Sequence, residues 1–198
     1  MVKSQTPRPT APRRADARRN RQAILEAARA LFSERGDAVQ IDEVAERAQV
    51  GVGTLYRHFS AKGSLLAAIV GDRFEQMTAL ARAAEEIDDP GEAFRALLTG
   101  YLEAAEADAA YRFAVLGPQE PDWDEINVEK QQFAEVVERI MGRAVEDDEL
   151  RPGLIGDDFV LITRGAMANM GNGRDWRRHV ELLLDGIRPQ GSRGRLRG

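Results

Sequence analysis

One short segment of the chain combines a hydroxyl, an aromatic ring, a guanidinium and an imidazole within nine residues. Residues 51–59 read GVGTLYRHF. Leu55 and Phe59 are one helical turn apart and are expected to face inward, which leaves the polar side chains outside. An exposed set of this kind suits hydrogen bonds and apolar contacts with the phosphates and base edges of a nucleic acid. The residues predicted to lie outside are Val52, Gly53, Thr54, Tyr56, Arg57 and His58.

Other kinds of chemistry find little support in the composition. The chain has no Cys and only two His, His58 and His179, so disulfides and cysteine-ligated metal sites are excluded. The acidic residues between 147 and 158 lack the spacing of an EF-hand loop, and we interpret them as solvated surface. We therefore predict no catalytic residue, no metal site and no cofactor.

The charge is unevenly distributed along the chain. The formal net charge is −5, yet the first 65 residues hold 12 Lys and Arg against 7 Asp and Glu, whereas the rest hold 16 against 26. A basic end on an acidic protein indicates that this end meets a polyanion. For residues 1–21, the most basic part, a solvated arm that binds nothing is the alternative.

Apolar residues recur at helical spacing along most of the chain, and no alternating run is long enough to build a sheet. We therefore predict an all-α fold of about nine helices. Only three residues separate the helices expected at 41–48 and 52–59, which is the geometry of a helix-turn-helix. The second of these helices would enter the major groove of DNA. A fourth helix is expected from about Ser60, a plausible N-cap, and it would be continuous into the acidic part of the chain.

The last two expected helices favour self-association. Residues 157–170 are apolar nearly all round, and a helix of that kind must be covered on every face. The helix that starts at 175 has a single apolar stripe, so two copies of both helices would form a four-helix interface. The alternative is that they simply complete the core of one subunit. The predicted interface residues are Ile162, Ala166, Met170, Trp176, Val180, Leu183, Leu184 and Ile187.

The segment from residue 19 to 70 resembles the DNA-binding domain of TetR-type transcriptional regulators. The resemblance rests on the motifs IDEVAERA, GTLYRHF and SAKGSLL, within about fifty consecutive residues. It implies that Tyr56 and His58 touch phosphates and that Val52, Gly53 and Thr54 lie nearest the base edges.

The resemblance also assigns roles outside the 52–59 helix. Lys62 matches a lysine that grips the DNA backbone, and Arg18 and Arg19 match an arm that reaches the minor groove. The chain departs from the family pattern at Gln40, where the family often has a Ser or Thr that caps a helix and touches a phosphate. It departs again at Gln49, which replaces a frequent Gly, and at residues 51–52, which replace a common Ser-Lys pair.

Beyond residue 70 the resemblance is architectural and implies a helical domain with an apolar ligand pocket. The predicted divisions are a disordered basic arm (1–17), a helix-turn-helix DNA-binding domain (18–65), an effector-binding and dimerisation domain (66–188) and a disordered tail (189–198). For any single pocket residue, ordinary core packing is the alternative. The predicted pocket residues are Tyr101, Phe113, Trp123, Phe133, Val137, Met141, Phe159, Thr163 and Met167.

Taken together, the sequence predicts a cytoplasmic, homodimeric, sequence-specific DNA-binding regulator. We expect a repressor that a small, mainly apolar effector releases from a palindromic operator. One alternative is a DNA-binding architectural protein without an effector. The other is an all-α enzyme, for which the sequence offers no well-placed acid-base pair.

Overall fold

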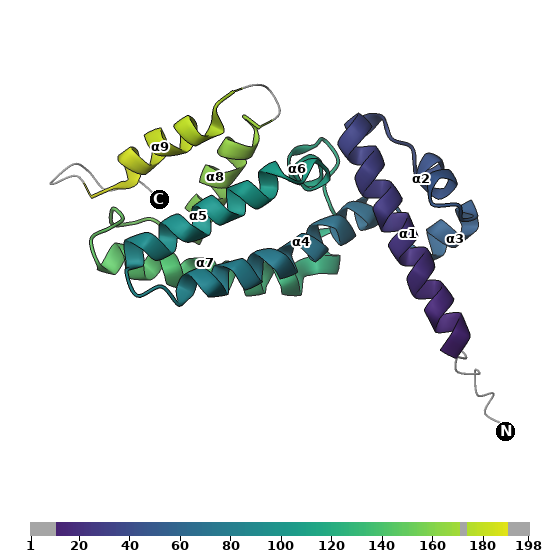
Figure 1. Ribbon diagram of the computed structural model, residues 1–198, viewed down its shortest axis with the longest axis horizontal. Helices are drawn as coiled ribbons and strands as arrows, with labels where there is room; N and C mark the ends of the chain where they lie inside the picture. Colours follow the sequence, from purple (N-terminus) through teal and green to yellow (C-terminus); the bar gives the residue numbers. More distant parts are fainter. Residues whose placement is uncertain (1–10, 171–173, 190–198) are drawn as a thin grey trace.

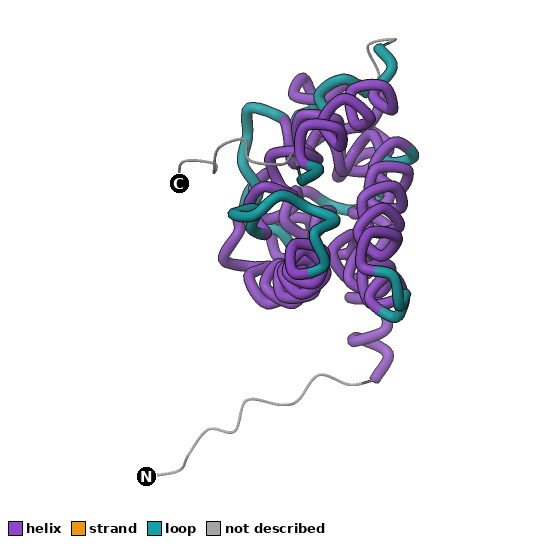
Figure 2. Tube along the Cα trace, turned by 90° about the vertical axis from the view of Figure 1, so that its left-hand side faces the viewer, coloured by secondary structure: helices purple, strands orange, loops and turns teal. Residues whose placement is uncertain are grey.

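The computed structural model describes residues 11–170 and 174–189, and these form helices and connecting loops without a strand (Figure 2). The predicted all-α fold is confirmed, with nine α-helices in the described part of the chain. The elements are α1 (Ala11–Arg35), η1 (Gly36–Ala38), α2 (Ile41–Arg47), α3 (Val52–His58), α4 (Lys62–Glu85), α5 (Pro90–Glu106), α6 (Ala109–Leu116), η2 (Trp123–Ile126), α7 (Asn127–Glu146), α8 (Gly156–Met167) and α9 (Trp176–Ile187).

The first helix begins earlier than the sequence predicted. The prolines were expected to keep the first dozen residues out of a helix and residues 1–17 to form a disordered arm, yet α1 starts at Ala11 and includes Pro12. Proline is tolerated in a first helical turn because the N–H that it lacks would have no helical partner there. The expectation is therefore wrong for residues 11–17. Residues 1–10, and the part of the predicted tail from 190 to 198, lie outside the described residues.

Helices α1, α2 and α3 form a small unit at one end of the molecule (Figure 1). Its core holds fully buried side chains from each helix, including Ile24, Val44 and Leu55. The chain leaves α1 at Gly36, whose φ of +55° is a conformation that glycine adopts without cost. Gln49, between α2 and α3, has the same φ of +55°. This left-handed turn explains why glycine is frequent at that position in the family that the sequence resembles.

Helix α4 joins this unit to the rest of the protein. It begins at Lys62 and continues for 24 residues into the larger bundle, so the predicted division between residues 65 and 66 falls inside one helix. The prediction that Ser60 caps this helix is wrong, because Ala61 occupies the N-cap. The Ser60 hydroxyl instead forms a 2.9 Å hydrogen bond with the hydroxyl of Ser64.

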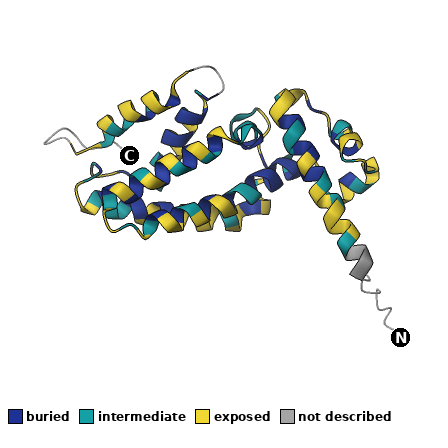
Figure 3. Cartoon of the chain, in the orientation of Figure 1, coloured by how far each residue is buried: buried dark blue, intermediate teal, exposed yellow. Residues whose placement is uncertain are grey.

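The larger bundle is built around α4, with α5 and α7 packed along it (Figure 1). The faces of these three helices that meet are buried, and their outer faces are exposed (Figure 3). The side chain of Asp89 caps α5 by accepting the N–H of Glu92 at 2.7 Å, and Pro90 follows as the first helical residue. Helix α6 lies between α1 and the bundle and contacts α1, α4 and α5.

The last two helices pack against each other, and α8 also packs on α5 and α7. Helix α8 ends at Met167, three residues before the predicted end at 170. Helix α9 begins at Trp176, and the side chain of Asp175 caps it by accepting the N–H of Arg178 at 3.1 Å.

One carboxylate ties α9 to the end of α5. The indole N–H of Trp176 donates to Oε1 of Glu106 at 2.7 Å, and the guanidinium of Arg177 donates to Oε2 at 2.9 Å. The hydrogen bonds from Arg177 and then from Trp176 hold the pKa of Glu106 below its ordinary value of 4.5. The ionised carboxylate is therefore the form that stabilises the fold.

This tether predicts a pH-dependent difference between the native chain and Glu106→Gln. The stabilising effect of a carboxylate with a lowered pKa is present above its unfolded-state pKa and is lost as the pH falls through the folded-state pKa. At pH 7 we expect Glu106→Gln to unfold at a lower temperature than the native chain, and this gap should close well below pH 4.5. Circular dichroism melts across the pH range measure it. Glu146→Gln, an exposed change on α7, is the control, and a gap that persists at low pH would contradict the tether.

Candidate nucleic-acid interface and ligand pocket

Helix α3 presents the outer face that the sequence predicted. Leu55 and Phe59 are buried in the small unit, whereas Val52 is 41% exposed and Tyr56 is 47% exposed. A Cβ added at Gly53 would meet nothing within 4 Å, so the fold itself does not require glycine there. The open space outside Gly53 leaves the helix backbone free to approach a large partner closely.

The polar side chains of α3 form a small cluster on this face. The Nε–H of Arg57 donates to the carbonyl of Gly53 at 3.1 Å, and its Nη2 donates to the hydroxyl of Thr54 at 2.7 Å. The guanidinium therefore lies back along its own helix, where it remains exposed. His58, the last residue of the helix, is half-buried beside Phe59.

A cleft of about 290 Å³ separates Tyr56 from the start of α2. Gln40 and Lys62 line it together with Tyr56. Gln40 is the N-cap residue of α2, and its backbone N–H donates to Oε2 of Glu43 at 2.8 Å. The cleft therefore combines a phenol, an amide and an ammonium group, which suit an anion, with one acidic residue, Asp42.

Lys62 already has partners within the chain. Its Nζ donates to Oδ1 of Asp37 at 2.9 Å and to the Asp37 carbonyl at 3.1 Å. The ammonium also lies 5.6 Å from the ring centre of Phe32 and 6.0 Å from that of Phe113. An anion that bound Lys62 would therefore compete with Asp37.

Arg18, Arg19 and Arg21 lie on α1. Arg18 and Arg19 are exposed on α1, and Arg19 is ion-paired with Asp16. The guanidinium of Arg21, which the sequence analysis did not single out, lies 5.4 Å from the ring centre of Phe59. This contact places the basic turn of α1 beside the end of α3.

A second site lies in the larger bundle, where a cavity of about 580 Å³ opens among α4, α5, α6, α7 and α8. Its walls are rich in aromatic rings, and the rim carries Lys130, Arg164, Glu138 and Asp157. Six of the predicted pocket residues line it: Tyr101, Trp123, Phe133, Val137, Phe159 and Thr163.

Three predicted pocket residues lie elsewhere. Phe113 stacks on Phe32 of α1 with the ring centres 5.3 Å apart, so it belongs to the contact between α6 and α1. Met141 and Met167 are each 1% exposed in the core and do not line the cavity. Helical periodicity indicates that a residue is buried but not what it faces. It therefore also missed Tyr111, which does line the cavity.

Two tyrosine hydroxyls meet at the cavity wall. The hydroxyl oxygens of Tyr101 and Tyr111 are 2.6 Å apart, and both side chains are buried. Burial raises the pKa of Tyr101, although hydrogen bonds from Tyr111 and Thr163 oppose it. Burial and the neighbouring phenol raise the pKa of Tyr111 well above its usual value. Both phenols are therefore neutral at physiological pH, and the cavity suits a mainly apolar molecule with a hydrogen-bonding group.

The residues predicted for a subunit interface pack largely within the subunit itself. Ile162, Ala166, Met170, Trp176 and Val180 are all less than 9% exposed, because the apolar stripes of α8 and α9 face the bundle and each other. The remaining three predicted residues, Leu183, Leu184 and Ile187, are half-buried.

The outer faces of α8 and α9 carry other apolar side chains, which the sequence analysis did not choose. Leu161 on α8 is 69% exposed and Leu182 on α9 is 63% exposed. Val160, also on α8, is 48% exposed, but it lines the cavity.

The described part of the chain holds no group of three or more His, Asp and Glu side chains arranged to hold a metal ion. Among the described helices, none has both the length and the apolar character that a bilayer span requires.

The small unit and its exposed third helix define a helix-turn-helix DNA-binding protein. Residues 24–69 match the family model for bacterial regulatory proteins of the tetR family. The HTH-type transcriptional repressor KstR of Rhodococcus jostii is 30% identical over 189 residues, which cover 87% of this chain and 84% of that protein. The chain belongs to the TetR family of bacterial transcriptional regulators.

Two further comparisons agree with this assignment. KstR of Mycolicibacterium smegmatis is 49% identical over 63 residues, and this match spans only 31% of each protein. The crystal structure of the TetR transcription regulatory protein from Mycobacterium vanbaalenii is 28% identical, with a TM-score of 0.54 over 89% of this chain and 99% of that one.

The geometry of α3 predicts that Tyr56→Ala weakens DNA binding by about 1–3 kcal/mol, because the exposed phenol is lost from the outer face of α3. Arg57→Ala should weaken binding further in the double variant. Fluorescence anisotropy with DNA selected from a random pool measures the affinity.

Both side chains are exposed, so the fold should survive their removal and the melting temperature should stay unchanged. Val128→Ala, an exposed change on α7, is the control. Full affinity in the double variant would show that α3 is not the reading helix.

Proposed function

We propose that this protein is a homodimeric transcriptional repressor that binds a palindromic operator through α3 and is released by a small, mainly apolar effector. The residues that we propose for the DNA contact are those of the exposed α3 face and the adjoining cleft. The relatives named above support repression, since both KstR proteins are described as transcriptional repressors.

The observation that carries the proposal is the 580 Å³ cavity with aromatic walls, in the same chain as the exposed α3 face. A purely architectural DNA-binding protein has no use for a cavity of this size, because an unfilled apolar cavity destabilises a fold. A ligand-responsive regulator does use one. The effector then acts by binding one arrangement of the two DNA-binding units more tightly than another.

We further propose that two subunits associate through the outer faces of α8 and α9. Leu161 and Leu182 are exposed on two helices that pack together, and we take them as the apolar centre of the interface. A two-fold axis between the subunits would present two α3 helices to successive major grooves, about one helical turn of DNA apart. This geometry requires an operator with two inverted half-sites.

The dimer predicts the behaviour of the double variant Leu161→Glu with Leu182→Glu. Placing carboxylates at the centre of an apolar interface separates the subunits because the buried charges have no partners. We expect a monomer by analytical ultracentrifugation, and we expect that it no longer selects an inverted repeat from a random DNA pool. The native chain should select one.

Val128→Glu is the matched control, because Val128 on α7 is 64% exposed and lies outside this surface. It should stay dimeric. A dimeric leucine double variant, or a native chain that selects no repeat, would overturn this part of the proposal.

The pocket predicts the behaviour of Ala134→Trp. Ala134 lines the cavity but is itself exposed, so an indole there fills the opening without overpacking the core. The probe is anilinonaphthalenesulfonate, a dye with apolar rings and one anionic group. We expect the dye to bind the native chain and to lower its affinity for DNA, and we expect Ala134→Trp to bind DNA normally but to bind the dye at least about tenfold more weakly.

Fluorescence titrations with and without DNA make this measurement. Ala79→Trp, an exposed alanine on α4 that does not line the cavity, is the control. If the dye binds equally well to both tryptophan variants, the cavity is not its site.

A further inference from the structure

Helix α6 touches both the ligand cavity and the DNA-binding unit. It has eight residues, and two of them, Tyr111 and Val115, line the cavity, where Tyr111 meets Tyr101. Two residues further on, Phe113 stacks against Phe32 of α1. Within these eight residues the helix reaches from the cavity to α1.

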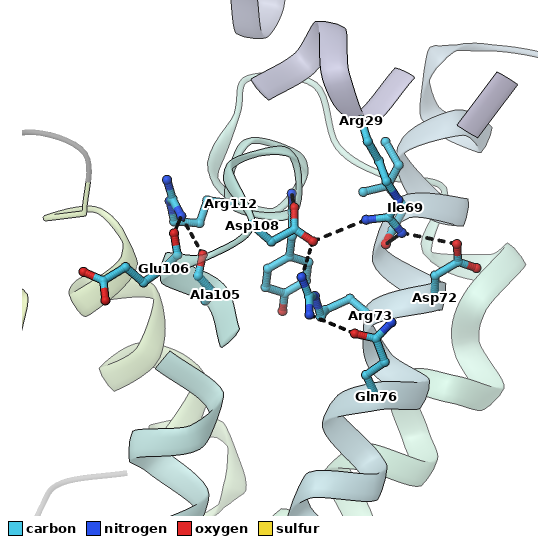
Figure 4. A network of polar contacts seen from close by, with 10 residues as sticks. Arg29, Ile69, Asp72, Arg73, Gln76, Ala105, Glu106, Asp108 and Arg112 are labelled. Atoms are coloured by element: carbon cyan, nitrogen blue, oxygen red, sulfur yellow. Dashed lines mark hydrogen bonds and ion pairs between the residues drawn. The ribbon is translucent and has the colours of Figure 1, made fainter. Parts of the chain in front are cut away.

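The residue that caps α6 holds the other elements together. Oδ1 of Asp108 accepts the backbone N–H of Tyr111 at 2.9 Å, so Asp108 is the N-cap at which α6 begins. Oδ2 accepts Nη1 of Arg29, from α1, at 3.3 Å, and it is also paired with Nη2 of Arg73, from α4. Figure 4 shows the two guanidinium groups converging on this one carboxylate.

The Arg29 guanidinium has two further partners, both on α4. Its Nη2 donates to the carbonyl of Ile69 and to Oδ2 of Asp72, each at 3.2 Å. Arg29 therefore joins α1 to α4 through Asp72 and to α6 through Asp108. Of these two carboxylates, Asp108 is the one that caps the helical turn carrying Tyr111, whereas Asp72 lies on the long helix α4.

The Asp108 contacts are shielded from water. The Asp108 side chain is 12% exposed and that of Arg73 is 17% exposed, whereas that of Asp72 is 45% exposed. Charge pairs in such surroundings are screened little by salt, and breaking one leaves a costly unpaired charge. In addition, Nε of Arg73 is buried without an acceptor among the described residues. An unpaired buried donor costs free energy, so a shift of α6 or α4 that supplied an acceptor would regain part of it.

From these contacts we propose that Asp108 couples occupancy of the cavity to the position of α1. The proposal rests on the function proposed above, in which the cavity binds the effector. A ligand that displaces the Tyr111 ring or takes its hydroxyl from Tyr101 pushes the first turn of α6. Because Asp108 caps that turn, its carboxylate moves with it and pulls on Arg29, and the DNA-binding unit shifts relative to α4.

The coupling is tested without an effector by cutting the bond between the two phenols. Tyr111→Phe keeps the ring and removes the hydroxyl, and Tyr101→Phe cuts the same bond from the α5 side. Each variant is combined with Asp108→Asn, which retains an oxygen to cap α6 but removes the charge that holds Arg29. Hydrogen exchange of the α6 amides and of the α1 amides at residues 25–33 is measured in the full chain, together with affinity for the selected DNA.

We expect either phenylalanine variant to speed hydrogen exchange in both α6 and α1. The exchange rates of the α1 amides and the DNA affinity should each change by about fivefold or more. When Asp108→Asn is also present, the phenylalanine substitution should still speed exchange in α6 but should no longer speed it in α1. Asp72→Asn is the matched control, since it also removes a carboxylate from Arg29 but lies on α4. It should leave the response of α1 intact.

The proposal is overturned if α1 responds equally with Asp108→Asn, if Asp72→Asn abolishes the response as well, or if neither phenylalanine variant alters exchange in α1. The exchange measurement needs no DNA and no ligand. If the native chain binds no DNA, the proposed function is refuted. If the chain binds DNA but hydrogen exchange in α1 does not change in the phenylalanine variants, only the coupling is refuted.

Discussion

The burial of α4 along most of its length is the constraint on which the rest of the structure depends. From Ser64 to Gly71 every residue of this helix is buried, because α1 covers it at one end while α7, α5 and α6 cover it further along. A helix enclosed in this way cannot tilt without repacking its neighbours. The DNA-binding unit and the cavity therefore both pack on one buried helix, and neither is an independent module on a flexible linker.

The fold and the exposed face of α3 were predictable because both follow from local patterns. Helical spacing of apolar residues fixed the inward side of α3, and the three-residue turn before it fixed its relation to α2. The start of α1 was missed because proline was treated as a helix breaker, although Pro12 stands in the first turn, where its missing N–H has no helical partner.

For the helices of the larger bundle, the neighbour that each apolar face packs against was less predictable. Phe113 and Met141 are apolar and helical, as pocket residues should be, yet one packs on α1 and the other fills the core. The stripe of α9 was clear in the sequence, but it indicates only that Val180 is covered and not whether the cover is its own chain or another. Asp108 pairs with Arg29, which is 79 positions away in the sequence, and with Arg73, which is 35 positions away. Charge pairs between such distant residues leave no periodic signal in the sequence.

The contact between Lys62 and Asp37 bears on how the protein would respond to salt. A free lysine that meets a DNA phosphate releases a cation from the DNA, and this release makes binding fall steeply as salt rises. Here the ammonium already has a carboxylate partner from its own chain. A phosphate that replaced Asp37 would set that carboxylate free to gather a cation of its own, which offsets the release. Binding of this protein to DNA should therefore depend less steeply on ionic strength than a count of its basic residues suggests.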